Sequence, residues 1–282
     1  MKNKKIKIVV FMIIFSILSF ITINSLINIM SWKSDNDKIK KQLKEIVEKT
    51  SIKEIDDNNE QILNKPPEVI NTDDESINEI NQPNPYWDYI KIKMIDVDFN
   101  ELKNLNQEVK GWIMVNGTNI NYPFVQSINN EYYLTHSFDK KYNKAGWVFL
   151  DYRNDIKSLD KNTVIYAHGR IDNTMFGSLK KSLGTAWYND LNNHFIKLST
   201  ETENTLWHIF SVYYIETTSD YIQTDFSDDT TFSSFLIKMK NRSLHNFNID
   251  VSKDDKVLTL STCYNQSEKV VMHAKLIKKS SK

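Results

Sequence analysis

The first hydrophobic stretch of the chain runs from Ile8 to Met30 and contains no charged residue. A helix of that length, rising about 1.5 Å per residue, crosses the roughly 30 Å apolar core of a bilayer. Residues 2–7 carry several lysines and no acid, which predicts a cytoplasmic N-terminus and an extracellular remainder. The stretch is longer than the apolar region of a signal peptide, and no small-residue cleavage site follows it. We predict a single-pass signal anchor in the cell membrane; the alternative is a removed signal peptide.

Polar residues dominate the next part of the chain. Within 35–50, apolar residues recur at helical spacing and predict a short amphipathic helix: Ile39, Leu43, Ile46 and Val47. Residues 51–85 are rich in Asn, Asp, Glu, Ser and Pro, a composition typical of a flexible spacer. The predicted organisation is a cytoplasmic N-terminus (1–7), a transmembrane anchor (8–30), a charged helix with a spacer (31–85) and one folded domain (86–282).

Short apolar or alternating runs predict that the folded domain is mainly β. They are 111–115, 120–126, 147–152, 163–168, 195–198, 206–215, 257–263 and 270–277. Asn116-Gly117 is a strong hairpin signal between the first two runs. Pro123 assigns the second run to a sheet edge or a bulge. The last two runs are expected to pair.

Few segments of the domain have a helical pattern. We predict a helix over 86–95, another begun by a capping box at Asp98 and Glu101, and a short one over 174–183. The clearest helix lies within 228–245, where Phe232, Phe235, Leu236 and Met239 share one face. Many short strands with few helices predict a closed or nearly closed barrel, with this last helix covering one side.

Charge and histidine spacing exclude two classes of function. The net charge is +0 at pH 7, with acids and bases interspersed, so nucleic-acid binding has no electrostatic support. No cofactor is indicated. Five histidines lack metal-ligand spacing and are interpreted as structural: His136, His194, His208, His245 and His273.

Two predicted strands end on residues that can carry chemistry. Val257–Cys263 ends on the only cysteine of the chain, and Thr163–His168 ends on a histidine followed by glycine. A thiol and an imidazole at strand ends suggest a nucleophile and its proton-transfer partner, brought together by sheet pairing. A buried structural cysteine is the alternative. The predicted extracellular location favours a reactive thiol, because one cysteine cannot form an internal disulfide.

Several motifs resemble those of the sortases, cysteine transpeptidases of Gram-positive cell surfaces. They are Thr259-Leu-Ser-Thr-Cys263, Ile165-Tyr-Ala-His168, Gly111-Trp-Ile, Asn121-Tyr-Pro, Asn130-Glu-Tyr-Tyr-Leu134, Phe149-Leu-Asp-Tyr-Arg153 and Met175-Phe-Gly177. The helix before the cysteine strand resembles the insertion of class B members. The resemblance implies a closed barrel of about eight strands with N-terminal helices, a long helix inserted before the cysteine strand and a single transmembrane anchor.

By this resemblance, Cys263 attacks a backbone carbonyl of a sorting-signal peptide on a secreted protein and forms a thioacyl enzyme. His168 acts as the general acid. An amine of a cell-wall precursor or a pilin resolves the intermediate, and class B members favour Asn-Pro-type signals. The expected partners are therefore surface proteins carrying such a signal, the accepting amine and the membrane around the N-terminal helix.

The sequence departs from the family at one catalytic position. Sortases carry an arginine at the start of the strand after the cysteine, whereas Lys269 occupies that place here. Lysine supplies charge but not a planar fork of donors. Three interpretations are open. Lys269 serves as a weaker substitute for the arginine, Arg170 reaches the site in its place, or the enzyme is catalytically impaired.

Other residues near these motifs are candidates for substrate binding. Ser261 and Thr262 flank the nucleophile, and Tyr166 shares a strand face with His168. Burial in the core is the alternative for each. At the level of function, a sortase-like receptor that binds peptides without turnover and a thiol peptidase that hydrolyses them remain open beside the transpeptidase.

Overall fold

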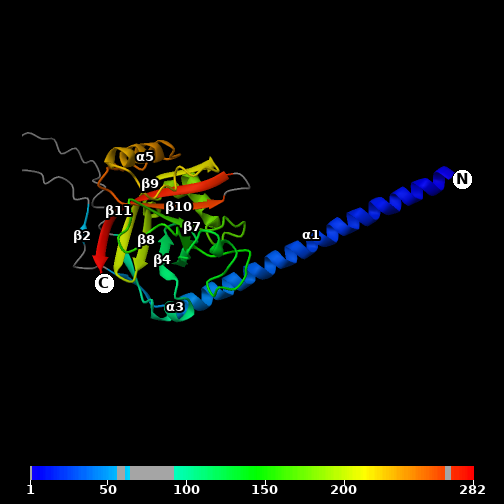
Figure 1. The fold of residues 1–282 in the computed structure, drawn as a ribbon, viewed down its shortest axis with the longest axis horizontal. Helices are drawn as coiled ribbons and strands as arrows, with labels where there is room; N and C mark the ends of the chain where they lie inside the picture. Colours follow the sequence, from blue (N-terminus) through cyan, green and yellow to red (C-terminus); the bar gives the residue numbers. More distant parts are fainter. Residues whose placement is uncertain (1, 56–60, 64–91, 264–267) are drawn as a thin grey trace, which may run out of the picture.

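A computed structural model describes residues 2–55, 61–63, 92–263 and 268–282. Its most extended element is helix α1 (Lys2–Lys49), which projects from the domain as a single rod (Figure 1). The stretch Ser31–Ser34 contains neither glycine nor proline, so nothing breaks the helix between its apolar and charged parts. The amphipathic helix predicted over 35–50 is therefore the end of the same helix. Its Ile39 and Ile46 are buried against the domain.

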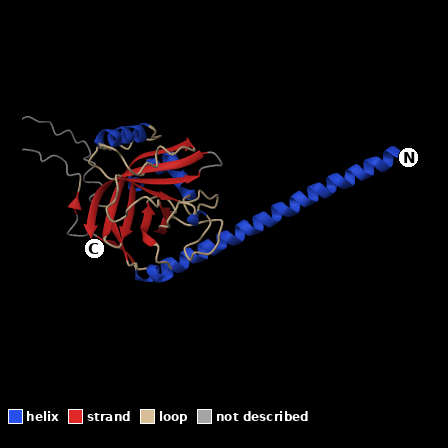
Figure 2. Ribbon diagram, viewed as in Figure 1, coloured by secondary structure: helices blue, strands red, loops and turns tan. Residues whose placement is uncertain are grey.

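The domain is a closed β-barrel of eight strands, in agreement with the prediction. Around the barrel the order is β10-β7-β6-β5-β4-β8-β9-β11, and β11 pairs back to β10. The strands are β4 (Val109–Val115), β5 (Asn121–Val125), β6 (Phe149–Leu150), β7 (Asn162–Tyr166), β8 (Phe195–Thr200), β9 (Glu203–Glu216), β10 (Val257–Cys263) and β11 (Glu268–Ser281). All neighbours are antiparallel except β5–β6 and β7–β10. Figure 2 shows the strands gathered in the domain, with loops and short helices connecting them.

Three short strands lie beside the barrel. β1 (Ile52–Ile55) pairs with β3 (Met94–Val97), and β2 (Gln61–Ile62) pairs with β11. The predicted spacer over 51–85 is therefore wrong for β1 and β2, whose pairing with distant strands leaves no local pattern. The rest of that stretch lies outside the described residues, apart from Ser51 and Leu63. The helix predicted over 86–95 is wrong at Met94 and Ile95, which belong to β3; residues 86–91 lie outside the described part.

The helices and turns between strands mostly follow the predictions. Helix α3 (Asn100–Leu105) is present, but Phe99 occupies its N-cap, and Asp98 accepts a bond from the Asn100 N–H instead of forming a capping box. The remaining short helices are η1 (Tyr132–Leu134), η2 (Gly177–Leu183), α4 (Thr185–Tyr188) and η3 (Leu191–His194). The helix predicted over 174–183 is thus a 3₁₀ helix that begins at Gly177.

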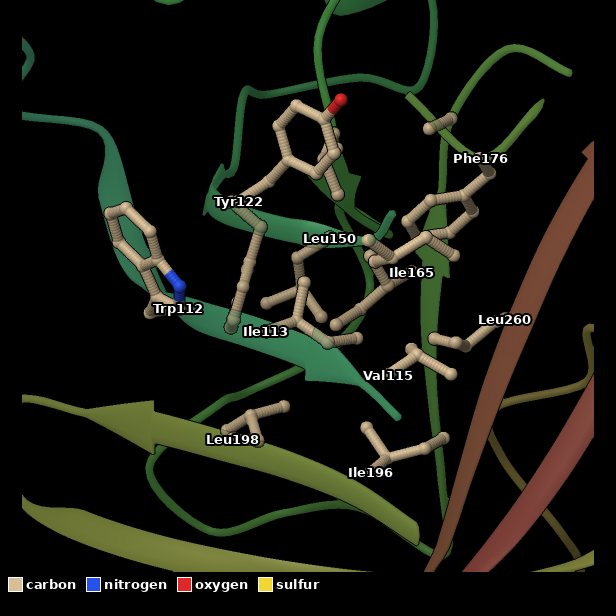
Figure 3. Packing of buried hydrophobic residues seen from close by; sticks show 14 of the residues in the cluster. Trp112, Ile113, Val115, Tyr122, Leu150, Ile165, Phe176, Ile196, Leu198 and Leu260 are labelled. Carbon is tan, nitrogen blue, oxygen red and sulfur yellow. The ribbon is translucent and has the colours of Figure 1, made fainter. Parts of the chain in front are cut away.

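Apolar side chains from the strands fill the barrel (Figure 3). Ile113, Ile165 and Leu260 come from three different strands and are fully buried. Helix α5 (Asp229–Asn241) covers an outer face (Figure 1), as predicted, with Phe232 and Met239 fully buried. This packing fixes the strands whose ends carry the candidate site.

Candidate active site

The site lies where β7 and β10 end side by side. These two strands are parallel, with Leu260 opposite Ile165 and Ser261 opposite Tyr166. The contact continues beyond β7, since the Ala167 N–H lies 3.4 Å from the Ser261 carbonyl oxygen. Parallel strands present their carboxyl ends at one edge of a sheet. His168 therefore follows β7 at the edge where β10 ends with Cys263, whose backbone alone is described.

Lys269 belongs to the neighbouring strand at the same edge. β11 is antiparallel to β10, and its register sets Lys269 directly opposite Cys263. Side chains of directly opposed residues in an antiparallel pair share a face, with Cβ atoms about 4.5–5.5 Å apart. The two positions are thus close through strand pairing, without any contribution from the connecting residues 264–267.

A groove of about 750 Å³ opens over these strand ends. That volume is within the range of small-molecule and peptide sites. Its lining comes from the ends of β7, β10 and β11, from the segment after β9 and from segments near η1 and β6. The lining residues are Asn130, Leu134, Phe149, Tyr166, Ala167, His168, Thr217, Thr218, Ser219, Tyr221, Ile222, Ser261, Thr262 and Lys269. Five of the predicted site residues are therefore gathered in one groove: His168, Lys269, Tyr166, Ser261 and Thr262.

The ring of His168 is held by a backbone carbonyl. Its Nε2 lies 2.7 Å from the carbonyl oxygen of Leu134, at the end of η1. A carbonyl only accepts hydrogen bonds, so Nε2 is the donor. Nδ1 is the ring nitrogen that this bond does not use. Sequence reasoning missed Leu134 in this role because a backbone acceptor has no residue-type signal.

Tyr166 is fixed in the wall of the groove by a buried carboxylate. Its hydroxyl donates to Asp151 Oδ2 at 2.8 Å, and Arg153 donates to both oxygens of Asp151 at 2.9 and 2.7 Å. Burial opposes ionisation of Asp151, but the hydrogen bonds from Arg153 and Tyr166 outweigh it and lower its pKa. Arg153 also donates to the Ile222 carbonyl at 2.9 Å, so it ties the groove segment after β9 to the barrel.

Ser261 and Thr262 differ in how their hydroxyls are used. Ser261 Oγ lies 3.0 Å from the Tyr221 hydroxyl, a bond inside the groove wall. Thr262 Oγ1 is buried and has no hydrogen-bond partner among the described residues. A buried hydroxyl without a partner is uncommon in proteins. Of the two hydroxyls, only that of Ser261 has a hydrogen-bond partner among the described residues.

Arg170 is absent from the groove lining. Its guanidinium donates to the Asn36 side chain on α1 and lies 5.8 Å from the ring of Trp32, on the same helix. A small cavity of about 50 Å³ beside Thr262 and Val270 also includes Arg170. Arg170 therefore packs against α1 and does not line the groove that contains Lys269.

The five remaining histidines make contacts inside the fold. His273 is fully buried, and His136 stacks on Tyr132 with ring centroids 4.1 Å apart. Among the described residues, no group of three or more His, Cys, Asp or Glu could hold a metal ion.

Known proteins resemble this chain in sequence and in fold. The family model for the sortase domain matches residues 113–277. Sortase B of Staphylococcus aureus (strain NCTC 8325 / PS 47) is 36% identical over 186 residues, covering 64% of this chain and 75% of the relative. Sortase B of Listeria monocytogenes is 37% identical over 188 residues, with the same coverage.

Solved structures of sortase B superpose on the domain. Bacillus anthracis sortase B in complex with AAEK1 has a TM-score of 0.60 and 41% identity, covering 64% of this chain and 84% of that one. A Staphylococcus aureus sortase B–substrate complex has the same TM-score and coverage, with 35% identity.

The closed barrel and the matching family model define the class: this chain belongs to the sortase family, and it is a transpeptidase of the sortase kind. Its relatives and structural neighbours are, more narrowly, sortases B. The class B features expected from the sequence are present, including helix α5 between β9 and β10.

Proposed function

We propose that the chain is a membrane-anchored sortase that cleaves a sorting-signal peptide on secreted proteins and transfers it to a cell-wall or pilin amine. One observation carries the proposal: His168 and Lys269 line one groove, and Cys263 is the register partner of Lys269 at the end of β10. Nucleophile, proton donor and cationic donor would then act on a single bound carbonyl.

In the proposed reaction the Cys263 thiolate attacks the peptide carbonyl carbon. The carbon–sulfur bond forms, the carbon–nitrogen bond breaks, and the leaving amine takes a proton from His168. The accepting amine then attacks the thioester, gives up a proton to His168 and releases the thiolate. Lys269 stabilises the developing oxyanion in place of the arginine of other sortases, and Thr262, which lines the groove, is a proposed contact to the peptide.

The location of the enzyme follows from its N-terminus. Helix α1 is long and apolar enough to cross a membrane. We propose a cytoplasmic end at 1–7, a transmembrane segment at 8–30 and an extracellular catalytic domain. The burial of Ile39 and Ile46 and the pairing of β1 and β2 support including the second half of α1 and these two strands in the proposed folded unit.

Mass spectrometry of the full chain in detergent, mixed with an Asn-Pro-type sorting peptide, tests the proposal. A thioacyl adduct should form on wild type, vanish in Cys263→Ala and fall about 100-fold in rate in Lys269→Ala, the usual cost of losing an oxyanion donor. Lys269→Arg should react at least as fast as wild type. An adduct that persists in Cys263→Ala would overturn the proposal.

The lysine at position 269 also favours a second candidate, a sortase-like protein that binds sorting peptides without turnover. In that case wild type binds the peptide but forms no adduct, whereas Lys269→Arg reacts. Adding an amine acceptor separates transfer from hydrolysis, because only transfer yields a ligated product.

A further inference from the structure

The segment directly after His168 is attached to the anchor helix. Arg170 is two residues beyond His168, and its guanidinium donates to Asn36 on α1. The Asn36 side of this contact is closed to solvent, with 3% of the residue exposed, and the Arg170 side chain is 9% exposed. Lys40 on the next turn of α1 lies 3.4 Å from Asp172 in the same segment.

This segment has little freedom of its own. The Phe176 N–H donates to the His168 carbonyl at 3.1 Å, and Asn173 N–H donates to the Arg170 carbonyl at the same distance. A Cβ on Gly177 would lie 2.0 Å from the Arg170 carbonyl oxygen, so the backbone is closely packed there. A displacement of Arg170 is therefore transmitted to the backbone of His168.

Helix α1 also contacts the segment that holds the His168 ring. The side-chain amide nitrogen of Asn143, Nδ2, lies 3.4 Å from the Asp35 carbonyl oxygen of α1. The backbone N–H of Asn143 in turn donates to the Thr135 carbonyl at 2.8 Å. Thr135 follows Leu134, whose carbonyl binds His168 Nε2. The helix thus supports His168 from both sides, through its backbone and through its ring.

From these contacts we propose that α1 positions His168 for proton transfer and that Arg170, paired with Asn36, is the positioning residue that links the anchor to the active site. The inference rests on the proposed role of His168. Small displacements of a catalytic group reduce turnover strongly, whereas substrate binding is shared among all the residues of the groove lining, most of which this link does not touch. Loss of the link should therefore lower kcat and leave KM for the peptide nearly unchanged.

A double-mutant cycle in the full chain, in detergent, measures this link. Asn36→Ala and Arg170→Ala should each lower kcat about 10-fold. The double variant should be no worse than Arg170→Ala, because Asn36→Ala removes a contact that Arg170→Ala has already removed. Arg170→Lys, which keeps the charge, should recover part of the rate. The matched control is Asp37→Ala, an exposed neighbour on α1. The proposal would be overturned if the kcat losses of the two single variants multiplied in the double variant. It would also be overturned if Asn36→Ala kept the kcat of wild type.

A second readout separates this inference from the proposed function, because it requires no turnover. Diethyl pyrocarbonate modifies accessible imidazoles, and peptide mass spectrometry follows His168 alone. Its modification should be about 5-fold faster in Asn36→Ala than in wild type or Asp37→Ala, because the ring is less firmly bound to Leu134. Buried His273 should stay unmodified and so reports intact folding. An unchanged rate at His168 overturns the inference, whether or not the enzyme is active.

Discussion

At the scale of single residues, the imidazole of His273 joins three strands beneath the site. Its Nδ1 lies 2.8 Å from Thr259 Oγ1 and its Nε2 lies 2.9 Å from the Tyr213 hydroxyl. The Thr259 hydroxyl donates to Asn162 Oδ1 at 2.6 Å, so it accepts from Nδ1, and Nε2 accepts from Tyr213. Each ring nitrogen of a neutral His273 therefore has a hydrogen-bond partner. Burial, reinforced by the positive charge of Arg242, lowers the pKa of His273 to about 3.

We predict that His273 makes the protein less stable in acid. The unfolded chain binds a proton on this residue below about pH 6.5, and the folded protein does so only near its folded pKa of about 3. Between these values the free energy of unfolding falls by about 1.4 kcal/mol per pH unit for this group. His273→Gln should be less stable at pH 7 but fall less steeply toward pH 4. Urea unfolding of both proteins between pH 7 and pH 4 checks this prediction. If the free energy of unfolding fell equally steeply with pH in the two proteins, the prediction would be contradicted.

Residue types allowed part of the site to be predicted. Cys263, His168 and Lys269 lie at or near strand ends, where the alternation of apolar residues stops, and strand pairing sets their backbone positions at one edge of the sheet. The role of Leu134 could not be predicted, because any residue offers the same carbonyl. Arg170 was an open candidate for the groove, and its actual partner, Asn36, lies 134 residues earlier without a local pattern to connect them.

At the scale of elements, the turn between β4 and β5 depends on one glycine. Gly117 has a φ of +69°, and a Cβ there would lie 2.2 Å from Asn193 Oδ1. The Asn116-Gly117 pair was therefore a reliable hairpin signal, since its second residue takes the left-handed region.

We predict that Gly117→Ala costs about 1–3 kcal/mol from backbone conformation, with the contact to Asn193 adding to that. Thermal unfolding measures the loss. Gly184→Ala is a matched control, because that glycine has an extended backbone and its nearest Cβ contact is an ordinary 3.4 Å. Equal losses in the two variants would show that the conformation of Gly117 is not the cause.

Strong local patterns identified α5 and the barrel strands, whereas β1 and β2 escaped prediction. Strands of four and two residues are too short for alternation to be recognised. They are strands because β3 and β11 offer free edges, and that information comes from distant parts of the chain.

At the scale of the whole molecule, the second half of α1 behaves as part of the domain. Ile39 and Ile46 are 1% and 2% exposed and pack in the main core cluster. We predict that a chain of residues 51–282 is less stable than one of residues 31–282 by about 3–6 kcal/mol, the value of burying two isoleucines. Denaturant unfolding compares them. The same midpoint in both would contradict the packing of α1.

The unbroken course of α1 has a consequence for which peptides the enzyme can reach. Asn36 follows Met30, the last residue of the proposed transmembrane segment, by six positions, or about 9 Å of helix. Because Asn36 contacts the segment after His168, the proposed anchor sets the height of the catalytic edge above the lipid. An extended peptide covers that height in about three residues. The anchor would then restrict which peptide bonds are cleaved by their distance from the bilayer, in addition to the selection by their sequence.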